Sequence, residues 1–196
     1  MNGRDAILRD LRRSAPPLSP LPEYPAALTY DNPEAQFAQA FTSVGGTFVR
    51  VANLAALDAE LGKLTIYTQA RNRVSLVPGA GTSTIDVAAM YQPHELLGVE
   101  LAILAGEFGV AENGAVWVPG SNLGPQRAIF VISEHLVLVV PAGQIVHTMQ
   151  HAYERIRFER PGFGVFLSGP SKTADIEQAL VIGAHGPRSC TLFLLG

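Results

Sequence analysis

The chain contains very little cysteine and few charged residues. Cys190 is the only cysteine among 196 residues, which excludes an intrachain disulfide, a zinc ribbon and a cysteine-ligated cluster. Cys190 falls in an apolar strand pattern, so we expect a buried core thiol. Charged residues make up 16%, against a usual share of about 25%. A surface partly covered by another subunit, including a second copy of the chain, is compatible with this composition.

Long apolar runs and a strong net charge are also absent. No segment approaches the roughly 18 consecutive apolar residues of a transmembrane helix. The net charge of −3 and the lack of a basic stripe argue against a nucleic-acid partner. The arginine-containing N-terminus has Asp5 and Asp10 interleaved and no apolar core behind it, so it does not resemble a signal peptide. We therefore expect a cytoplasmic protein.

The first 30 residues differ in character from the rest. Residues 3–13 have the pattern of a short amphipathic helix, and residues 14–26 contain five prolines, which are incompatible with a helix or a central strand. The sequence predicts an N-terminal helix and proline-rich arm over 1–30 and an α/β domain over 31–196.

Helical and strand patterns alternate after residue 30. Helices are predicted over 33–44, 53–61 and 143–158, and strands over 47–51, 64–67, 74–77, 100–104, 115–118, 136–141, 165–167 and 191–195. Such alternation favours an open, largely parallel sheet with helices on both faces. Ligands of these sheets bind beyond the carboxyl ends of the strands. We expect the loops 106–114 and 168–175 to lie there.

The most informative segment is Ser-Gly-Pro-Ser-Lys-Thr-Ala-Asp-Ile-Glu at 168–177, followed by Gly-Ala-His-Gly-Pro at 183–187. Thr173 is a suitable helix N-cap, and Asp175 would lie in the first helical turn. Exposed backbone N–H groups beside Lys172 could hold a carboxylate or phosphate. An ordinary strand–loop–helix connection explains the same spacing equally well.

This segment resembles the closing signature of the lactate-utilization (LUD) domain family, in its lactate utilization protein C branch. Weaker similarities lie at 103–118, around Ala-Glu-Asn-Gly at 111–114, and at 134–146. The family usually has arginine where this chain has Lys172, and lysine lacks the bidentate fork for a carboxylate or phosphate. The resemblance implies a fold like that of the NagB/RpiA/CoA-transferase group.

The resemblance also implies a role in a system that oxidises L-lactate to pyruvate. Iron–sulfur clusters would be carried by partner subunits, and this chain would bind no cofactor or metal of its own. Its share would be an assembly role or the binding of a small organic acid or an acyl- or phosphate-bearing ligand. The ligand-binding residues implied are Ser171, Lys172, Thr173 and Asp175, with Glu112 and His185 as the candidate catalytic groups. A scaffold without a pocket is a further alternative.

Glu112 supports a different hypothesis as well. Type I CoA transferases form a thioester on a glutamate in a similar Glu-Asn-Gly segment, so a stand-alone CoA-transferase-like or sugar-phosphate-isomerase-like enzyme is an alternative. Asn113-Gly114 between two strands is equally typical of a hairpin turn.

The histidines have alternative interpretations. His185, between glycines, could be a general base or could fix its turn by hydrogen bonding. His135 opens an apolar strand and is expected to be a core or rim histidine with its hydrogen bonds satisfied. His147 and His151 are four apart on the predicted 143–158 helix, where a solvated face is favoured over a zinc site without a third ligand.

Overall fold

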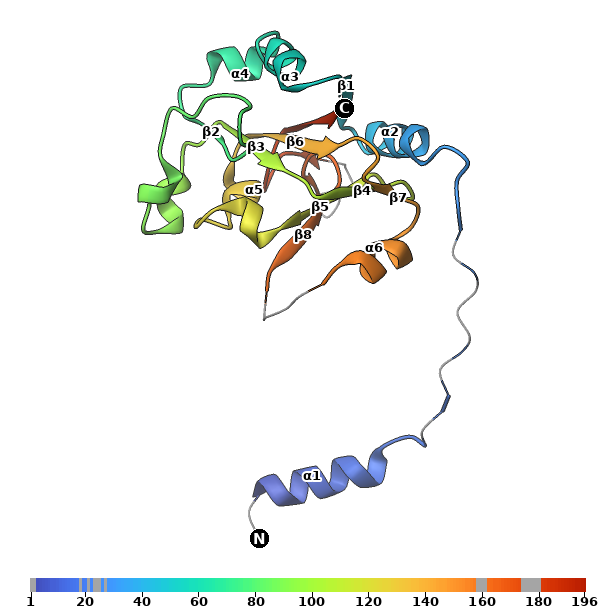
Figure 1. Cartoon of the computed structure of the whole chain (residues 1–196). Coiled ribbons are helices and arrows are strands. Elements are labelled where there is room, and N and C mark those ends of the chain that lie inside the picture. The colour runs from blue at the N-terminus through green and yellow to red at the C-terminus, as the bar shows by residue number, and fades with distance from the viewer. Residues whose placement is uncertain are drawn as a thin grey trace.

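The computed structural model describes residues 3–17, 19, 20, 22, 26, 28–157, 162–173 and 181–196. Its centre is a parallel five-stranded sheet in the order β1-β11-β6-β3-β2. These strands are β1 (Thr47–Val51), β2 (Arg73–Ser75), β3 (Leu101–Ala105), β6 (His135–Pro141) and β11 (Ser189–Leu195). The predicted α/β class with a largely parallel central sheet and flanking helices is confirmed (Figure 1).

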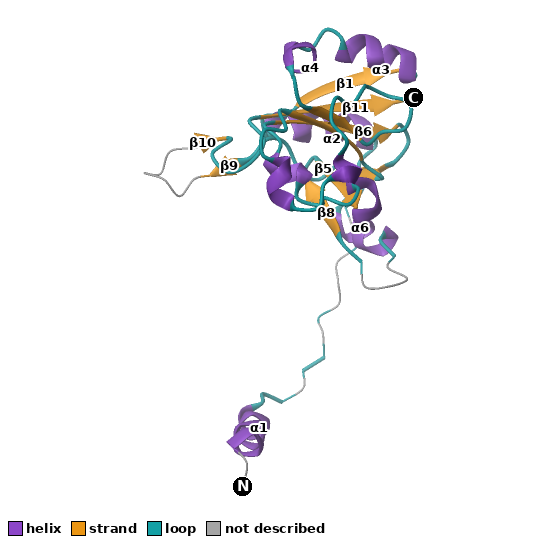
Figure 2. Cartoon of the chain, turned by 90° about the vertical axis from the view of Figure 1, so that its left-hand side faces the viewer, coloured by secondary structure: helices purple, strands orange, loops and turns teal. Residues whose placement is uncertain are grey.

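A second sheet of four strands packs against the first, in the order β7-β4-β5-β8. Its strands are β4 (Phe108–Val110), β5 (Ala115–Pro119), β7 (Ile145–Val146) and β8 (Gly164–Leu167). Strand β5 is antiparallel to both β4 and β8, and β7 is parallel to β4. A separate hairpin of β9 (Lys172–Thr173) and β10 (Val181–Ile182) projects from the body (Figure 2).

Helices are short, and side-chain caps define two of their starts. They are α1 (Gly3–Ser14), α2 (Pro33–Ser43), α3 (Leu54–Leu61), α4 (Thr65–Gln69), α5 (Ile129–Ile132) and α6 (Met149–Arg155). Three 3₁₀ turns lie at Val87–Ala89, Pro93–Leu96 and Gly120–Leu123. Asn32 accepts a hydrogen bond from Ala35 N, and Asn53 accepts one from Ala56 N, so both predicted helix starts are confirmed.

Alternating side chains divide the interior into three layers. In β6, Leu136, Leu138 and Val140 face the central core between the two sheets, whereas Val137 and Val139 face the layer under α3 and α4. In β5, Val116 and Val118 face the central core, and Trp117 belongs to an outer cluster with α6. Since strand side chains alternate between faces, strands buried on both sides are apolar throughout.

Cys190 occupies the central core, as predicted. Only 1% of the residue is exposed, and burial raises the pKa of its thiol to about 12. Such a thiol stays protonated and unreactive at neutral pH.

Two predicted elements are wrong. Residues 64–67, predicted as a strand, belong to a helical turn at α4, where the backbone N–H groups of Tyr67 and Thr68 donate to Leu64 O. The predicted 143–158 helix is confined to α6, and Ile145 lies in strand β7. The edge of β4 explains the second error, because Gly109 N and Ala111 N donate to Gln144 O and Val146 O. Unpaired strand donors need acceptors, and this requirement outweighs a helical apolar pattern.

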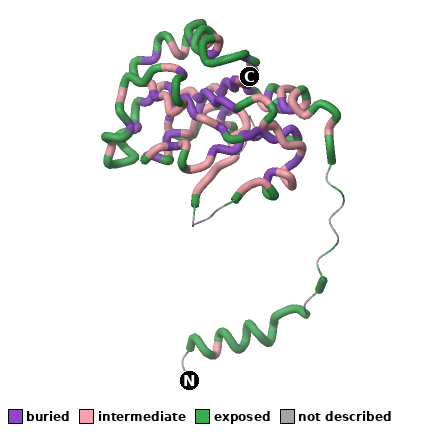
Figure 3. The backbone as a smooth tube through the Cα atoms, in the orientation of Figure 1, coloured by how far each residue is buried: buried purple, intermediate pink, exposed green. Residues whose placement is uncertain are grey.

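Helix α1 stands apart from the α/β body (Figure 1). None of its residues is buried, and the connecting segment is exposed wherever it is described (Figure 3). The division of the chain at residue 30 stays a prediction. Within the described part of the chain, no helix has both the length and the apolar character to cross a bilayer.

Candidate ligand site at the amino edge of the sheet

The signature segment brings Ser171 and the His185 loop together. Ser171 N donates to Pro187 O at 2.9 Å, and Gly183 N donates to Ser171 O at 3.0 Å. A Cβ added at Gly186 would lie 2.9 Å from Ser171 Cβ, so the two segments are in close contact. His185 itself is exposed. The structure therefore joins two of the predicted site residues in one surface loop cluster.

The turn that contains Glu112 lies next to the start of the signature segment. Ser168 Oγ donates to Asn113 O at 2.9 Å. Gly114 has φ +67°, and an added Cβ would lie 2.6 Å from Phe41 N, so the turn packs directly on α2. The hairpin turn predicted for Asn113-Gly114 is confirmed between β4 and β5. The Glu112 carboxylate accepts a hydrogen bond from Met149 N at 2.8 Å, at the start of α6.

The two predicted loops thus meet, but at the opposite edge from the one expected. The loop after β8 belongs to the second sheet, and Gly169 packs on Val44 O, just before β1 begins. Pro187, which bonds Ser171, stands just before β11. The signature therefore lies at the amino ends of the parallel strands. The expectation failed because it assumed a single sheet in which every strand ran in the same direction.

Thr173 lies in strand β9 and pairs with Val181, so the described part does not place it at a helix start. Pairing with the antiparallel strand satisfies its backbone in place of a helical turn. Lys172 is exposed in the same strand. Asp175, the remaining predicted ligand-binding residue, lies outside the described residues.

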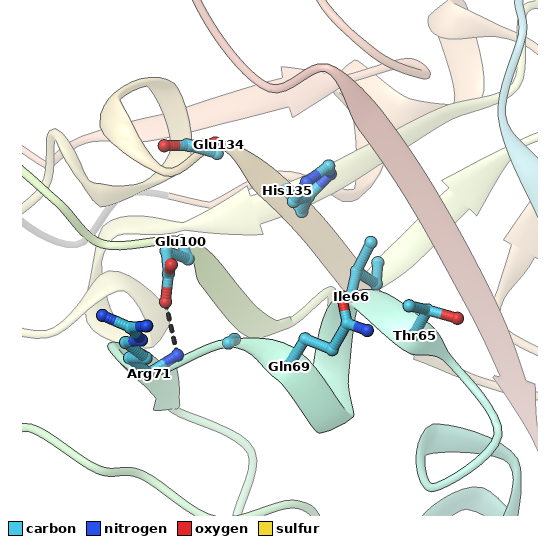
Figure 4. Close-up of a pocket in the computed structure, with 8 residues that line it drawn as sticks. Thr65, Ile66, Gln69, Arg71, Glu100, Glu134 and His135 are labelled. Atoms are coloured by element: carbon cyan, nitrogen blue, oxygen red, sulfur yellow. Dashed lines mark hydrogen bonds between the residues drawn. The ribbon is translucent and has the colours of Figure 1, made fainter.

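A pocket of about 480 Å³ opens at the amino ends of β2, β3 and β6. Glu100, Glu134 and His135 come from the sheet edge, and α4 with the loop after it supplies the facing wall (Figure 4). The residues of that wall are Thr65, Ile66, Gln69, Ala70 and Arg71. A concave site with a few convergent polar groups has the general character of a small-ligand site.

Both carboxylates of the pocket already have partners. Glu100 accepts hydrogen bonds from Asn72 N at 2.9 Å and from Arg71 N, and these bonds hold its pKa below the usual value. Glu134 forms a salt bridge with Arg188 at 3.4 Å. The Arg71 guanidinium forms no salt bridge with any described carboxylate. Its charge acts on Glu100 at a distance, but its guanidinium donors can still bind a carboxylate ligand.

His135 is the titratable group best placed in this pocket. Its Nδ1 lies 2.8 Å from Ser189 Oγ, which fixes the ring and leaves Nε2 as the second polar atom. Burial lowers its pKa below 6.5; Glu134 and Glu100 oppose the shift and Arg188 adds to it. A neutral imidazole at physiological pH can donate or accept a hydrogen bond. Of the two positions predicted for His135, core or rim, the structure shows the rim, with Nδ1 bonded to Ser189.

The pocket and the signature loop share a wall. Arg188 N donates to Glu134 O at 2.7 Å, and Ser189 holds His135. Arg188 follows the His185 loop by three residues. The sequence analysis did not identify Arg71, Glu100 or Glu134 as site residues. The available signal was that Arg71 and Glu100 each stand just before a strand of the parallel sheet.

The histidines at 147 and 151 are half-buried rather than on a solvated face. His147 precedes α6 and accepts a hydrogen bond from Tyr30 N at 3.0 Å, while His151 bonds Thr148 Oγ1 at 2.9 Å. The prediction of a solvated helix face for the pair is wrong, because His147 lies outside the helix. Over the described residues, no group of three or more potential ligands is arranged to hold a metal ion.

The two-sheet α/β architecture is shared with a solved structure. A DUF162 family protein from Deinococcus radiodurans superposes with a TM-score of 0.62, covering 87% of this chain and all of that chain at 19% identity. This similarity supports the fold alone. The model of the LUD domain matches residues 85–195, more than half of the chain, and the chain belongs to the LUD domain family.

Curated relatives agree with this membership. A lactate utilization protein C from Shouchella clausii is 33% identical over 45% of this chain and 40% of the relative. One from Anoxybacillus flavithermus is 37% identical over 44% of this chain and 39% of the relative. The uncharacterized protein YkgG of Escherichia coli is 28% identical over 65% and 54%. The matches thus span about half the length of these relatives.

Proposed function

We propose that this chain is a component of a lactate-utilization system that supports oxidation of L-lactate to pyruvate. The names of the lactate utilization protein C relatives support the system. Within it, the chain binds a small organic acid, and cytoplasmic partner subunits carry the iron–sulfur clusters. The sole cysteine is buried in the core, so the described chain offers no thiolate set for a cluster.

The pocket at the amino edge is the single observation that carries the ligand-binding role. Arg71 supplies guanidinium donors for a carboxylate, and His135 stands across the pocket with a neutral ring for a hydroxyl or keto group. Thr65 and Gln69 add neutral hydrogen-bonding groups. This set fits a small hydroxy or keto acid, with one charged end and one polar uncharged group.

The signature residues form a second proposed contact region. Ser171, Lys172, Thr173, Asp175, His185 and Glu112 are proposed from the family resemblance to contact the ligand or the partner subunits. Arg188, which follows the signature segment, bonds to Glu134 in the wall of the pocket. A partner bound to the signature segment would therefore lie next to the pocket.

Ligand-dependent thermal stabilisation tests the proposal. We expect L-lactate or pyruvate to raise the melting temperature, and Arg71→Ala to weaken binding about tenfold to a hundredfold, since a charge-assisted hydrogen bond contributes roughly 1.5–3 kcal/mol. The panel also contains glycolate, CoA, acetyl-CoA, ribose 5-phosphate and phosphate. Growth on L-lactate of a host strain that depends on the chain is measured in parallel.

Two comparison variants locate the effect. Arg13→Ala removes one exposed positive charge on α1, which stands apart from the α/β body, and should leave binding unchanged. Lys172→Ala tests the signature region. Binding that survives Arg71→Ala but is lost with Lys172→Ala would move the ligand from the pocket to the signature loop. A shift only with CoA esters or sugar phosphates would reject the organic-acid role.

A further inference from the structure

Helix α1 has an apolar stripe without a partner in the described structure. Ile7, Leu8 and Leu11 lie at helical spacing on one face, and their exposed fractions are 63%, 37% and 61%. A helix of 12 residues is marginal in water by itself, and most helices are stabilised by burying such a stripe. The stripe therefore requires a surface to cover.

The α/β body has an apolar groove of matching character on α6. Its volume is about 630 Å³, and it is lined by Met149, Gln150, Tyr153 and Glu154. Tyr153 is 66% exposed, although its ring packs edge-on against Phe166 at 6.1 Å. The outer aromatic cluster of Phe108, Trp117 and Phe166 lies beneath. An exposed aromatic beside a packed aromatic cluster is typical of a docking surface.

The linker from α1 is anchored next to this groove. Tyr30 N donates to His147 Nδ1 at 3.0 Å, and the two rings stack with centroids 6.3 Å apart. His147 is two residues before α6. The roughly 15 residues of 15–29 can span about 50 Å when extended. A covalent connection of this length raises the local concentration of α1 near α6, so even a weak contact is populated.

Charge complements the fit. Helix α1 contains four arginines and two aspartates, and Arg12 and Arg13 stand in its last turn. The groove has Glu154 at its rim, and the Glu112 carboxylate lies at the start of α6. Arg12, which flanks the stripe, would lie near these acidic groups, whereas Arg13 lies on the opposite face of the helix.

We propose that α1 folds back on its own chain and places Ile7, Leu8 and Leu11 in the groove lined by Met149 and Tyr153. The occupant is the chain's own N-terminal helix, held close by the Tyr30–His147 anchor. Docking covers the exposed Tyr153 and the aromatic cluster beneath it. The inference concerns α6 and is independent of the pocket at the amino edge.

Cysteine cross-linking in the full-length chain tests this docking. The native thiol is silent, because Cys190 is 1% exposed and its pKa is raised to about 12. The test variant combines Leu11→Cys with Gln150→Cys, and a short bismaleimide links the two thiols. The matched control combines Arg13→Cys with Gln150→Cys, since two residues along a helix turn the side chain by about 200°, to the opposite face.

We expect the Leu11→Cys pair to form an intramolecular cross-link at least about fivefold faster than the Arg13→Cys pair, as tethered docking predicts. Adding Ile7→Gln to the test variant should reduce its rate to that of the control. Equal rates for the two pairs, or no effect of Ile7→Gln, would overturn the proposal. Cross-links only between chains, increasing with protein concentration, would also overturn it and make a second copy the occupant.

Discussion

At the scale of single residues, His135 is the titratable group of the pocket whose pKa is shifted by burial. It sits half-buried at the start of β6, held by Ser189 and surrounded by Glu134, Glu100 and Arg188. Burial favours the neutral imidazole, which is the form that can accept a proton or a hydrogen bond from a ligand hydroxyl. The sequence predicted only a core or rim position for this residue.

The lowered pKa of His135 predicts a specific loss of stability in acid. Above pH 6.5, the ring is neutral in both states. As the pH falls below 6.5, the unfolded state binds the proton first, so the free energy of unfolding decreases until the pH passes the lower folded pKa. Urea unfolding between about pH 7.5 and pH 5 should show a shallower decline for His135→Gln than for the wild type. His94→Gln, which changes an exposed histidine, is the control. Parallel declines for His135→Gln and the wild type would contradict this prediction.

At the scale of elements, α6 shows how a neighbouring turn supports a short helix. Its N-cap residue, Thr148, makes no capping hydrogen bond, because its hydroxyl bonds His151 instead. The Glu112 carboxylate takes the place of a cap by accepting from Met149 N. A negative charge at a helix N-terminus is favourable in itself. The described geometry gives Glu112 a structural task in addition to the catalytic role proposed for it.

We expect Glu112→Ala to lower the free energy of unfolding by about 1 kcal/mol, the usual effect of removing a helix cap. Glu112→Gln keeps an oxygen acceptor and should lose less than half of that. Urea denaturation of both variants measures the difference. If Glu112→Gln left stability unchanged but abolished an acyl-transfer or isomerase activity, a chemical role of Glu112 would be established instead. A fully stable Glu112→Ala variant would contradict the capping role.

At the scale of the whole molecule, the central core joins the two sheets. Leu138 of β6 and Val116 of β5 are both completely buried in it, together with Phe41 of α2. Neither sheet has a separate interior on this side, so the two sheets should unfold as one cooperative unit.

Leu138→Ala should therefore destabilise both sheets, by about 2–5 kcal/mol. Fluorescence of Trp117, the only tryptophan, reports on the second sheet, and far-UV circular dichroism reports on the whole chain. The two transitions should coincide in the wild type and in the variant. Leu97→Ala, at a side chain of a residue 72% exposed, should change the stability by less than about 0.5 kcal/mol. Separate midpoints for the two probes would show that the sheets unfold independently.

The sequence by itself determined the elements that depend on local chemistry. The apolar runs of β6 and β11 predicted strands, and Asn32 and Asn53 marked helix starts correctly. The signature at 168–187 by itself indicated the LUD domain family, to which the chain belongs. These features were readable because apolar periodicity and caps act within a few residues.

Only the tertiary structure decided which edge of the sheet holds the candidate site. The reversal of β5 and the pairing of Ile145 with Gly109 create a second sheet, and this sheet turns the signature loop to the amino ends of the parallel strands. The pocket joins Arg71, Glu100 and His135 from segments far apart in the chain. Strand partners and strand directions are set by long-range hydrogen bonds and by burial between layers, which no local pattern encodes.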